Sequence, residues 1–416
     1  MRRWQRYTGH ATLHRVTADS NSLRRGLVDD LERRNLVRTP AVRDAFLRIP
    51  RERFVPELAA ERGLEAIYKD EALVTKQEQG LAVSSSSQPA IMAEMLERLE
   101  VAPGQHVLEI GAGTGYNAAL LAELAGGVVT LDVDEELVEK ARRRLADGGH
   151  AAEVVAGDGM DGWPDRAPYD RIMVTATPPH IPIAWRDQLR EGGLLEVPTP
   201  IGHGGVFAFL VTTFRRQGDE LVSQAIVSGG FIGFRGPDGR RPDFRLPTLG
   251  WYDRTGGRHA GLALTGAGIA ALSAGARRRL VGMLVGEPRR TGLGRGADVE
   301  LFLYLVCSAR PQQLVAAYGG DQRLGLLDEQ GSLALLRYRW QQVERIGVVG
   351  AEFFGDPGPA EADLRRIVSE WQSLGRPTLS DFEIRVAFGR PPRGATWRLP
   401  SPGDARIGVS VRPRSG

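Results

Sequence analysis

The sequence predicts an α/β fold with a parallel-rich sheet, followed by a smaller C-terminal α+β domain. Between residues 106 and 176, short apolar segments alternate with helical segments, which is typical of parallel strands joined by crossover helices. The chain has 416 residues, more than one ordinary domain holds. A stretch rich in glycine, proline and arginine, 233–247, fits neither pattern and indicates where the first domain ends.

The first domain shows a regular order of elements. A short apolar segment, 106–110, runs directly into a glycine-rich turn and then into an apolar helical segment. The expected strands are 106–110, 128–133, 152–155 and 171–176, and the expected helices are 116–124 and 135–145. Because the intervening segments are long enough to cross over the sheet, the strands should run parallel.

The C-terminal region carries mixed signals. Residues 359–374 have the apolar spacing of an amphipathic helix, and residues 382–388 alternate like a half-buried strand. Residues 299–306 form a continuous apolar run, for which we predict a buried strand. The expected organisation is an N-terminal arm (1–22), a first domain (23–235), a linker (236–247) and a C-terminal domain (248–416), whose extra surface would serve peptide recognition.

Composition and charge exclude several classes of protein. Apolar residues make up 42% and charged residues 25% of the chain, as in a globular protein, which excludes a disordered chain and a collagen-like repeat. The 54 basic and 51 acidic residues nearly balance, and no basic block of the kind found on nucleic-acid binders occurs. We therefore expect no nucleic-acid partner.

Cysteine content and hydropathy point to a cytoplasmic protein. Cys307 is the sole cysteine, so no intrachain disulfide and no cysteine-ligated metal site can form, and we expect a buried thiol and no bound metal. No apolar segment follows the first residues, so we expect no signal peptide. The longest uncharged stretch, 260–276, is too short to span a bilayer, so we expect no membrane partner.

The glycine-rich turn carries the chemistry. Gly111, Gly113 and Gly115 follow a strand and precede a helix, where backbone N–H groups can approach a ligand closely. The third glycine of a dinucleotide fingerprint would fall at Tyr116, which argues against NAD or FAD, and no lysine follows as in a phosphate-binding loop. Asp132 ends the next strand, where an acid accepts hydrogen bonds from a ribose diol.

These residues resemble the S-adenosylmethionine (SAM) site of Rossmann-like methyltransferases. Asp158, after the following strand, would then lie near the adenine amino group. The resemblance implies SAM as cofactor and S-adenosylhomocysteine as product. The candidate cofactor-binding residues are Glu109, Gly111, Gly113, Thr114, Gly115, Tyr116, Asn117, Asp132, Asp158 and Gly159.

Flanking motifs narrow the resemblance to the protein-L-isoaspartate O-methyltransferase family. IPRERFVP (49–56), YKD (68–70), SQP (87–89), VLEIG (107–111), GDG (157–159) and VTA (174–176) follow one another in that family's order, over about residues 25–215. The resemblance implies that Ser87 lies beside the reacting methyl group as the catalytic residue. Ser85, Ser86, Gln88 and Tyr68 are the candidate substrate-binding residues.

Residues 73–87 depart from the family pattern. This segment is longer than the family's, lacks its histidine and carries a run of four serines, 84–87. Longer family forms with such serine runs and a C-terminal extension occur in gene clusters for ribosomally synthesised, modified peptides such as graspetides, lanthipeptides and lasso peptides. The resemblance to them implies methylation of an aspartate side chain in a cyclised precursor peptide, whose ester then closes to an aspartimide (succinimide).

Two other functions remain open from the sequence. One is repair-type methylation of isoaspartyl residues, and the other is a non-catalytic peptide-binding module. Methylation of a nucleobase amine is disfavoured, because residues 177–180, TPPH, lack the acceptor and the aromatic residue that such a loop needs. Methylation of a carboxylate needs no catalytic triad, because a carboxylate with a pKa of about 4 is already ionised near neutral pH.

Overall fold

The computed structural model describes residues 10–203, 206–239, 248–250, 263–284, 286–318, 322–342, 345–399, 401 and 403–412. The chain forms two compact units that interleave along the sequence. The first comprises Met1–Ala176, Asp187–Val197 and Phe231–Arg240, and the second comprises Thr177–Arg186, Pro198–Gly230 and Arg241–Gly416. The units therefore do not follow a single cut at the expected linker, 236–247, of which residues 240–247 lie outside the described residues.

The first unit begins with helices. They are α1 (His10–Arg33), α2 (Pro40–Arg48), the 3₁₀ turn η1 (Arg51–Phe54), α3 (Pro56–Arg62) and α4 (Leu64–Ile67). Thr39 caps α2 by accepting from the Val42 amide, and Pro40 starts the helix. The expected arm is wrong for residues 10–22, because α1 begins at His10 and continues without a break into the domain; no glycine or proline interrupts 10–25. Residues 1–9 lie outside the described residues.

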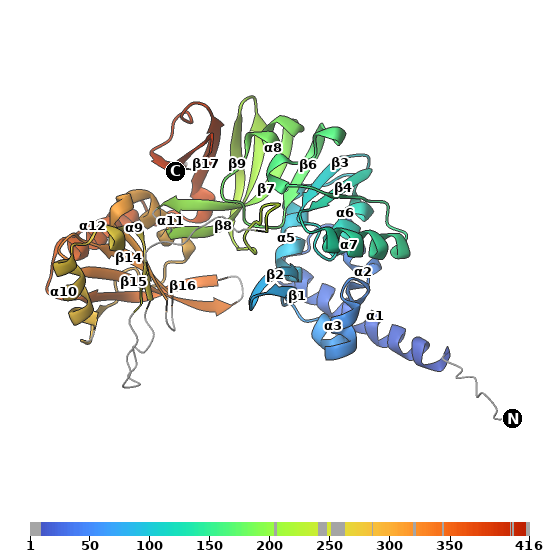
Figure 1. Ribbon diagram of the computed structural model, residues 1–416, viewed down its shortest axis with the longest axis horizontal. Coiled ribbons are helices and arrows are strands. Elements are labelled where there is room, and N and C mark those ends of the chain that lie inside the picture. Colours follow the sequence, from blue (N-terminus) through green and yellow to red (C-terminus); the bar gives the residue numbers. More distant parts are fainter. Residues whose placement is uncertain are drawn as a thin grey trace. The chain divides into compact units, whose positions relative to one another are not determined.

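A parallel sheet forms the centre of the first unit, as predicted (Figure 1). Its order is β5 (Glu153–Ala156), β4 (Gly127–Asp132), β3 (His106–Ile110), β6 (Tyr169–Val174) and β7 (Leu189–His203), of which the last residues belong to the second unit. The accompanying helices are α5 (Pro89–Leu99), α6 (Tyr116–Leu124) and α7 (Glu135–Gly148). All six predicted elements are confirmed within a few residues at each end.

The register of this sheet decides where the site lies. Ile110 at the end of β3 pairs with Leu131 on β4 and with Val174 on β6. The strands are buried, with Val107, Leu108 and Leu131 at 0% exposure, as expected for a parallel sheet covered on both faces. The carboxyl ends of the strands, and the turns that follow them, therefore meet at one edge of the sheet.

The segment that departs from the family pattern forms a β-hairpin. Strand β1 (Leu73–Glu78) pairs with the antiparallel β2 (Leu81–Ser86). The turn uses Gln79 and Gly80, both with positive φ, as tight hairpins require. The four-serine run thus begins within β2 and ends at Ser87, just before α5.

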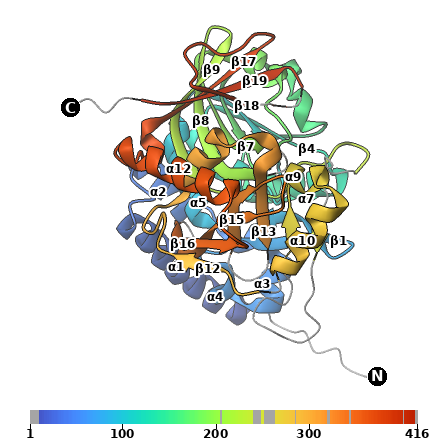
Figure 2. The ribbon, with the colours of Figure 1, turned by 90° about the vertical axis from the view of Figure 1, so that its left-hand side faces the viewer.

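The second unit is rich in antiparallel strands, and the predicted α+β class is confirmed. One group has the order β8 (Val206–Gln217), β9 (Glu220–Ser228), β17 (Phe382–Phe388), β19 (Ala405–Val411) and β18 (Trp397–Leu399). A further sheet has the order β10 (Thr248–Gly250), β11 (Ala263–Thr265), β13 (Leu314–Tyr318), β14 (Gln322–Leu327), β15 (Leu333–Gln342), β16 (Arg345–Phe354) and β12 (Arg289–Thr291). Helices α9 (Ala267–Ala271) and α10 (Ala274–Leu284) pack on this sheet through a shared apolar core (Figure 2).

The strand predicted for residues 299–306 is wrong. These residues belong to helix α11 (Val299–Ser308), in which Leu301, Leu303 and Leu305 are all fully buried. A helix that is buried on every side has no polar face, so its sequence lacks the periodicity that separates helix from strand. Cys307 lies on this helix, buried as expected, and burial raises the pKa of its thiol. The predicted helix at 359–374 is confirmed as α12 (Pro359–Ser373), and the strand at 382–388 as β17.

The described residues also bear on membranes and metal ions as partners. No helix in this part of the chain combines the length and apolarity needed to cross a membrane. Within the same residues, no cluster of three or more histidine, cysteine or acidic side chains is placed to hold a metal ion.

Candidate cofactor and substrate site

The glycine turn joins β3 to α6 at the carboxyl edge of the sheet. Gly111 and Gly113 have φ values of +105° and +51°, a region that residues with a side chain rarely adopt. A Cβ atom on Gly111 would also lie 2.5 Å from the Thr175 hydroxyl. The amides of Gly111 and Ala112 donate to the Leu131 carbonyl at 2.8 and 3.0 Å, which ties the turn to β4. The turn thus has no side chains of its own at positions 111 and 113, which lets neighbouring groups approach its backbone closely.

Asp132 lies beside this turn, at the end of β4. Its Oδ2 accepts from the Gly113 amide at 2.9 Å, and its Oδ1 accepts from the Asp134 amide at 3.1 Å. Burial raises the pKa of the Asp132 carboxyl, and the two amide hydrogen bonds partly offset that rise. Because a carboxylate oxygen has two acceptor positions, each oxygen can accept one further hydrogen bond. Asp132 is therefore oriented to accept from a diol.

Asp158 and Gly159 follow β5 at the same edge. Asp158 Oδ1 accepts from the Met160 amide at 2.9 Å and starts the short turn η2 (Gly159–Asp161). A Cβ atom on Gly159 would lie 2.6 Å from the Phe234 ring and 2.7 Å from Ile110. Phe234 thus packs directly against the GDG motif, a contact that the sequence did not predict because 75 residues of chain separate the two.

Glu109, Tyr116 and Asn117, three of the expected cofactor residues, are buried beneath the turn. Glu109 is fully buried and accepts from Thr130 at 2.5 Å and from Asn117 at 2.8 Å. Burial raises the pKa of Glu109 to about 7. Tyr116 is 2% exposed, and its ring packs on Phe54. These side chains support the turn from the core side.

Thr114 also turns inward. It is 4% exposed, and its hydroxyl accepts from the Tyr116 amide at 3.3 Å, at the start of α6. Of the ten expected cofactor residues, the three turn glycines, Asp132, Asp158 and Gly159 are therefore the ones that line the carboxyl edge of the sheet.

The hairpin brings the serine run against the glycine turn. A Cβ atom on Gly113 would lie 3.6 Å from the Ser85 carbonyl oxygen and 3.7 Å from the Ser84 hydroxyl. Ser84 is buried and accepts from the Thr75 hydroxyl at 3.1 Å, across the hairpin. Among the described residues the buried Ser86 hydroxyl has no hydrogen-bond partner, and Ser87 is half-buried. The structure therefore places Ser84 and Ser85 next to the glycine turn, and Ser86 and Ser87 continue the chain from there to α5.

Arg51 holds the end of this serine run in place, and the sequence did not predict that role. Its guanidinium is completely buried and donates to five backbone carbonyls, those of Ile67, Lys69, Glu71, Ser86 and Ser87, at 2.8 to 3.4 Å. Burial lowers the pKa of Arg51. The RERFVP motif thus supplies the side chain that connects residues 67–71 to Ser86 and Ser87.

Tyr68 and Gln88, two of the expected substrate-binding residues, make hydrogen bonds within the protein. Tyr68 is 6% exposed; its hydroxyl donates to Glu52 and accepts from Arg24 at 3.2 Å, and burial raises its pKa to about 12. Gln88 donates to Asp70 at 3.2 Å, and the same carboxylate accepts from the Ala90 amide at 2.8 Å. Asp70 thereby caps α5, directly after the catalytic candidate.

Comparison with known proteins decides the family. The model of the Protein-L-isoaspartate(D-aspartate) O-methyltransferase (PCMT) family matches residues 22–233. The chain belongs to this family. It is thus a SAM-dependent carboxyl O-methyltransferase.

Similar PCMT proteins are known from archaea. The protein-L-isoaspartate O-methyltransferase of Hyperthermus butylicus is 41% identical over 187 residues, which are 42% of this chain and 74% of that protein. The enzyme of the same name from Methanothermobacter thermautotrophicus is 38% identical over 220 residues, which are 52% of this chain and 96% of that protein. Both matches fall within about half of the chain.

A solved structure is similar over nearly the whole chain. It is titled protein-L-isoaspartate O-methyltransferase and aligns with a TM-score of 0.51 at 22% identity, covering 93% of this chain and 99% of its own. At this identity the likeness shows the fold alone. The structural alignment extends beyond residues 22–233, the range of the family match, so the C-terminal half of the chain also has a counterpart in that solved structure.

SAM, the methyl donor of PCMT enzymes, fits the residues present. Gly111 and Gly113 leave the backbone open, Asp132 keeps two acceptor positions for ribose hydroxyls, and Asp158 lies at the next strand end, where the adenine would be held. When bound, SAM supplies an electrophilic methyl group on a sulfonium. The chain supplies the binding surface, and its hairpin covers the turn on the side of Ser84 and Ser85.

Replacing Asp132 with alanine should weaken SAM binding by more than tenfold, roughly 1.4 kcal/mol or more, because the ribose diol loses its acceptor. Isothermal calorimetry with SAM measures this directly. Asp132→Asn, which keeps one acceptor oxygen, should fall between the alanine variant and the wild type. An unchanged affinity in Asp132→Ala would remove the proposed ribose site.

Proposed function

We propose that this PCMT enzyme methylates an aspartate side chain of a modified, macrocyclic ribosomal peptide, and that the methyl ester then closes to an aspartimide. The observation that carries the proposal is the β1–β2 hairpin. It carries Ser84 and Ser85, the first two of the four serines, against the glycine turn, in the segment whose length and serines resemble the peptide-modifying forms of the family. The C-terminal region, 248–416, would add surface that recognises the peptide, and the enzyme would act in the cytoplasm.

The chain's part in the methyl transfer is positional. Ser87 would donate its hydroxyl hydrogen to one carboxylate oxygen of the substrate, which orients the carboxylate without removing its charge. The other oxygen, ionised because the pKa of such a group is about 4, is the nucleophile. Arg51 holds the Ser87 carbonyl at 2.9 Å, so that the serine keeps its place while the substrate binds. In-line positioning and exclusion of water then account for most of the rate.

The closing step needs no further residue of the enzyme. The nitrogen of the next peptide bond attacks the ester carbonyl, its hydrogen leaves with the methoxy group as methanol, and a five-membered imide remains. A folded or cyclised peptide favours this step when it holds the nitrogen close to the ester. The precursor, the methyl ester and the imide therefore each have a different mass.

A repair-type reaction is the second candidate, in which isoaspartyl residues of damaged proteins are methylated. The names of the similar proteins favour it, since both archaeal enzymes are protein-L-isoaspartate O-methyltransferases. The fold likeness to a solved enzyme of that name over 93% of the chain also means that a second unit alone does not separate the two candidates. The substrate must separate them.

Mass spectrometry with two substrates tests the proposal. The enzyme and SAM are incubated with a flexible isoaspartyl peptide and, separately, with a cyclised ribosomal peptide that contains an aspartate. We expect the cyclised peptide to gain one CH₂ unit and then to lose methanol, which leaves a product one water lighter than the precursor. Efficient turnover of the isoaspartyl peptide with no preference for the cyclised one would assign the enzyme to repair.

A further inference from the structure

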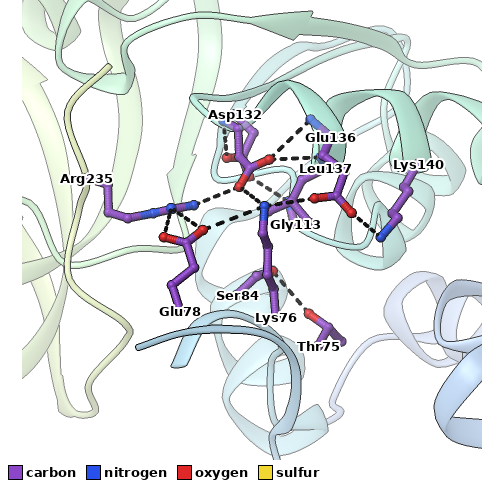
Figure 3. A network of polar contacts seen from close by, with 11 residues as sticks. Thr75, Lys76, Glu78, Ser84, Gly113, Asp132, Glu136, Leu137, Lys140 and Arg235 are labelled. Carbon is purple, nitrogen blue, oxygen red and sulfur yellow. Dashed lines mark hydrogen bonds and ion pairs between the residues drawn. The ribbon is translucent and has the colours of Figure 1, made fainter. Parts of the chain in front are cut away.

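Two cationic side chains, Lys76 and Arg235, hold the β1–β2 hairpin to the segment that follows Asp132, the candidate ribose-binding acid. Lys76 on β1 donates to Asp134 Oδ2 at 2.7 Å and to Glu136 at 2.9 Å. Arg235 donates to the same Asp134 oxygen at 3.0 Å and pairs with Glu78 on β1 at 3.2 Å (Figure 3). We call these five residues, Lys76, Glu78, Asp134, Glu136 and Arg235, the hairpin latch.

Asp134 connects the latch to the cofactor side. Its Oδ1 caps α7 by accepting from the Glu136 and Leu137 amides at 3.1 and 3.3 Å, while Oδ2 accepts from both cations. Its own amide donates to Asp132 at 3.1 Å. Burial would raise the pKa of the Asp134 carboxyl, but the hydrogen bonds from Lys76 and Arg235 lower it overall.

The latch is more than a surface ion pair. The side chains of Asp134 and Arg235 are only 9% and 10% exposed, and that of Lys76 is 25% exposed. Fully exposed pairs contribute little because water and salt screen them, whereas partly buried pairs that share one carboxylate are screened less. The latch therefore contributes to keeping β1 and β2 beside the turn.

Lys76, Glu78 and Arg235 lie outside the sequence motifs that carry the family resemblance. Lys76 and Glu78 belong to the longer 73–87 segment, and Arg235 follows the end of the family match at residue 233. Ser84, which pairs with Lys76 across the hairpin, and the next residue, Ser85, lie against Gly113. Release of the latch would free the strand that covers the cofactor turn and carries the chain into Ser87.

We propose that Lys76 and Arg235 are positioning residues that hold the hairpin closed over the cofactor turn, so that they slow cofactor release and keep Ser87 in place. Opening of the latch lets the cofactor enter and its product leave. The inference rests on the cofactor site of the proposed function and not on the identity of the peptide.

The test uses the full chain and needs no peptide. Lys76→Met and Arg235→Met remove the cations, and Asp134→Asn removes the shared charge while keeping a good helix cap. Lys140→Met is the matched control, because Lys140 pairs with Glu136 at 2.6 Å on the same helix without touching the hairpin. One readout is hydrogen–deuterium exchange of the amides of residues 73–86 in the ligand-free protein. The other is the dissociation rate of S-adenosylhomocysteine.

We expect each latch variant to exchange its hairpin amides faster and to release S-adenosylhomocysteine about three- to tenfold faster than wild type. Lys76→Arg keeps the positive charge and should match the wild type in both amide exchange and the dissociation rate. Lys140→Met should change neither quantity. Raising sodium chloride from about 0.05 M to about 0.5 M should speed release from the wild type but not from a Lys76→Met/Arg235→Met variant, because salt screens the latch charges.

Unchanged exchange and release in Lys76→Met, Arg235→Met and Asp134→Asn would overturn the inference, and so would equal effects in Lys140→Met. These outcomes are separate from those of the peptide assay. If the latch variants behave as expected while the cyclised peptide is not methylated, the substrate proposal alone fails.

Discussion

Replacing Arg51 with alanine should destabilise the first unit by about 3–5 kcal/mol, because buried carbonyls lose their donors and a cavity replaces the guanidinium. Five carbonyls accept from this one side chain, and the Lys69 carbonyl also accepts from the Glu71 amide at 2.9 Å. The measurement is urea unfolding followed by a signal from the first unit, since a chain with two units need not unfold in one step.

Neighbouring substitutions separate this effect from a general loss of charge. Arg53 lies two residues away and is exposed, so Arg53→Ala should leave the unfolding midpoint nearly unchanged. Arg51→Lys keeps the charge but lacks the planar fork that reaches both 67–71 and Ser86–Ser87, so it should recover only part of the loss. Equal midpoints for Arg51→Ala and Arg53→Ala would show that the network contributes nothing.

Replacing Ser87 with alanine should lower the methylation rate about 10- to 100-fold, because a hydrogen bond to a charged group is worth roughly 1.5–3 kcal/mol. SAM affinity should stay nearly intact, since Ser87 would contact the substrate carboxylate and not the ribose or adenine. Steady-state kinetics with a methyl-accepting peptide give the rate, and calorimetry gives the SAM affinity.

The conservative variant supplies the control for Ser87. Ser87→Thr keeps the hydroxyl and should retain more activity than Ser87→Ala. Wild-type turnover in Ser87→Ala would falsify the catalytic role of this residue. A loss of SAM affinity equal to the loss of rate would instead make Ser87 a support of the cofactor turn.

The parallel sheet was predictable because its elements carry distinct local patterns. Segments such as 106–110 are short and apolar and lead into glycine, while 135–145 has a polar helical face. The expectation for 299–306 failed where the pattern vanishes, since α11 is buried on all sides. The polar residues 10–22 gave no periodicity either, although they form the first half of α1.

For the candidate site, the sequence predicted positions along the sheet but not the directions of the side chains. Gly111, Gly113 and Asp132 were found because the ends of successive parallel strands must meet at one edge. Glu109 and Tyr68 lie in motifs that carry the family resemblance. The Glu109 carboxyl and the Tyr68 hydroxyl nevertheless point into buried hydrogen-bond networks. Side-chain direction depends on neighbours from distant segments, and no sequence spacing reports it.

By itself, the sequence determined the α/β class of the first domain, the glycine turn and the acids at the strand ends, because each depends on a local pattern and on the fixed geometry of parallel strands. Only the tertiary structure decided that Arg51 anchors Ser86 and Ser87, that Phe234 packs on Gly159, and that Lys76 and Arg235 share Asp134. Those contacts join residues up to 101 positions apart, as for Arg235 and Asp134. The physical reason is that a buried donor or charge must find a partner in space, and the chain reaches that partner only after it has folded.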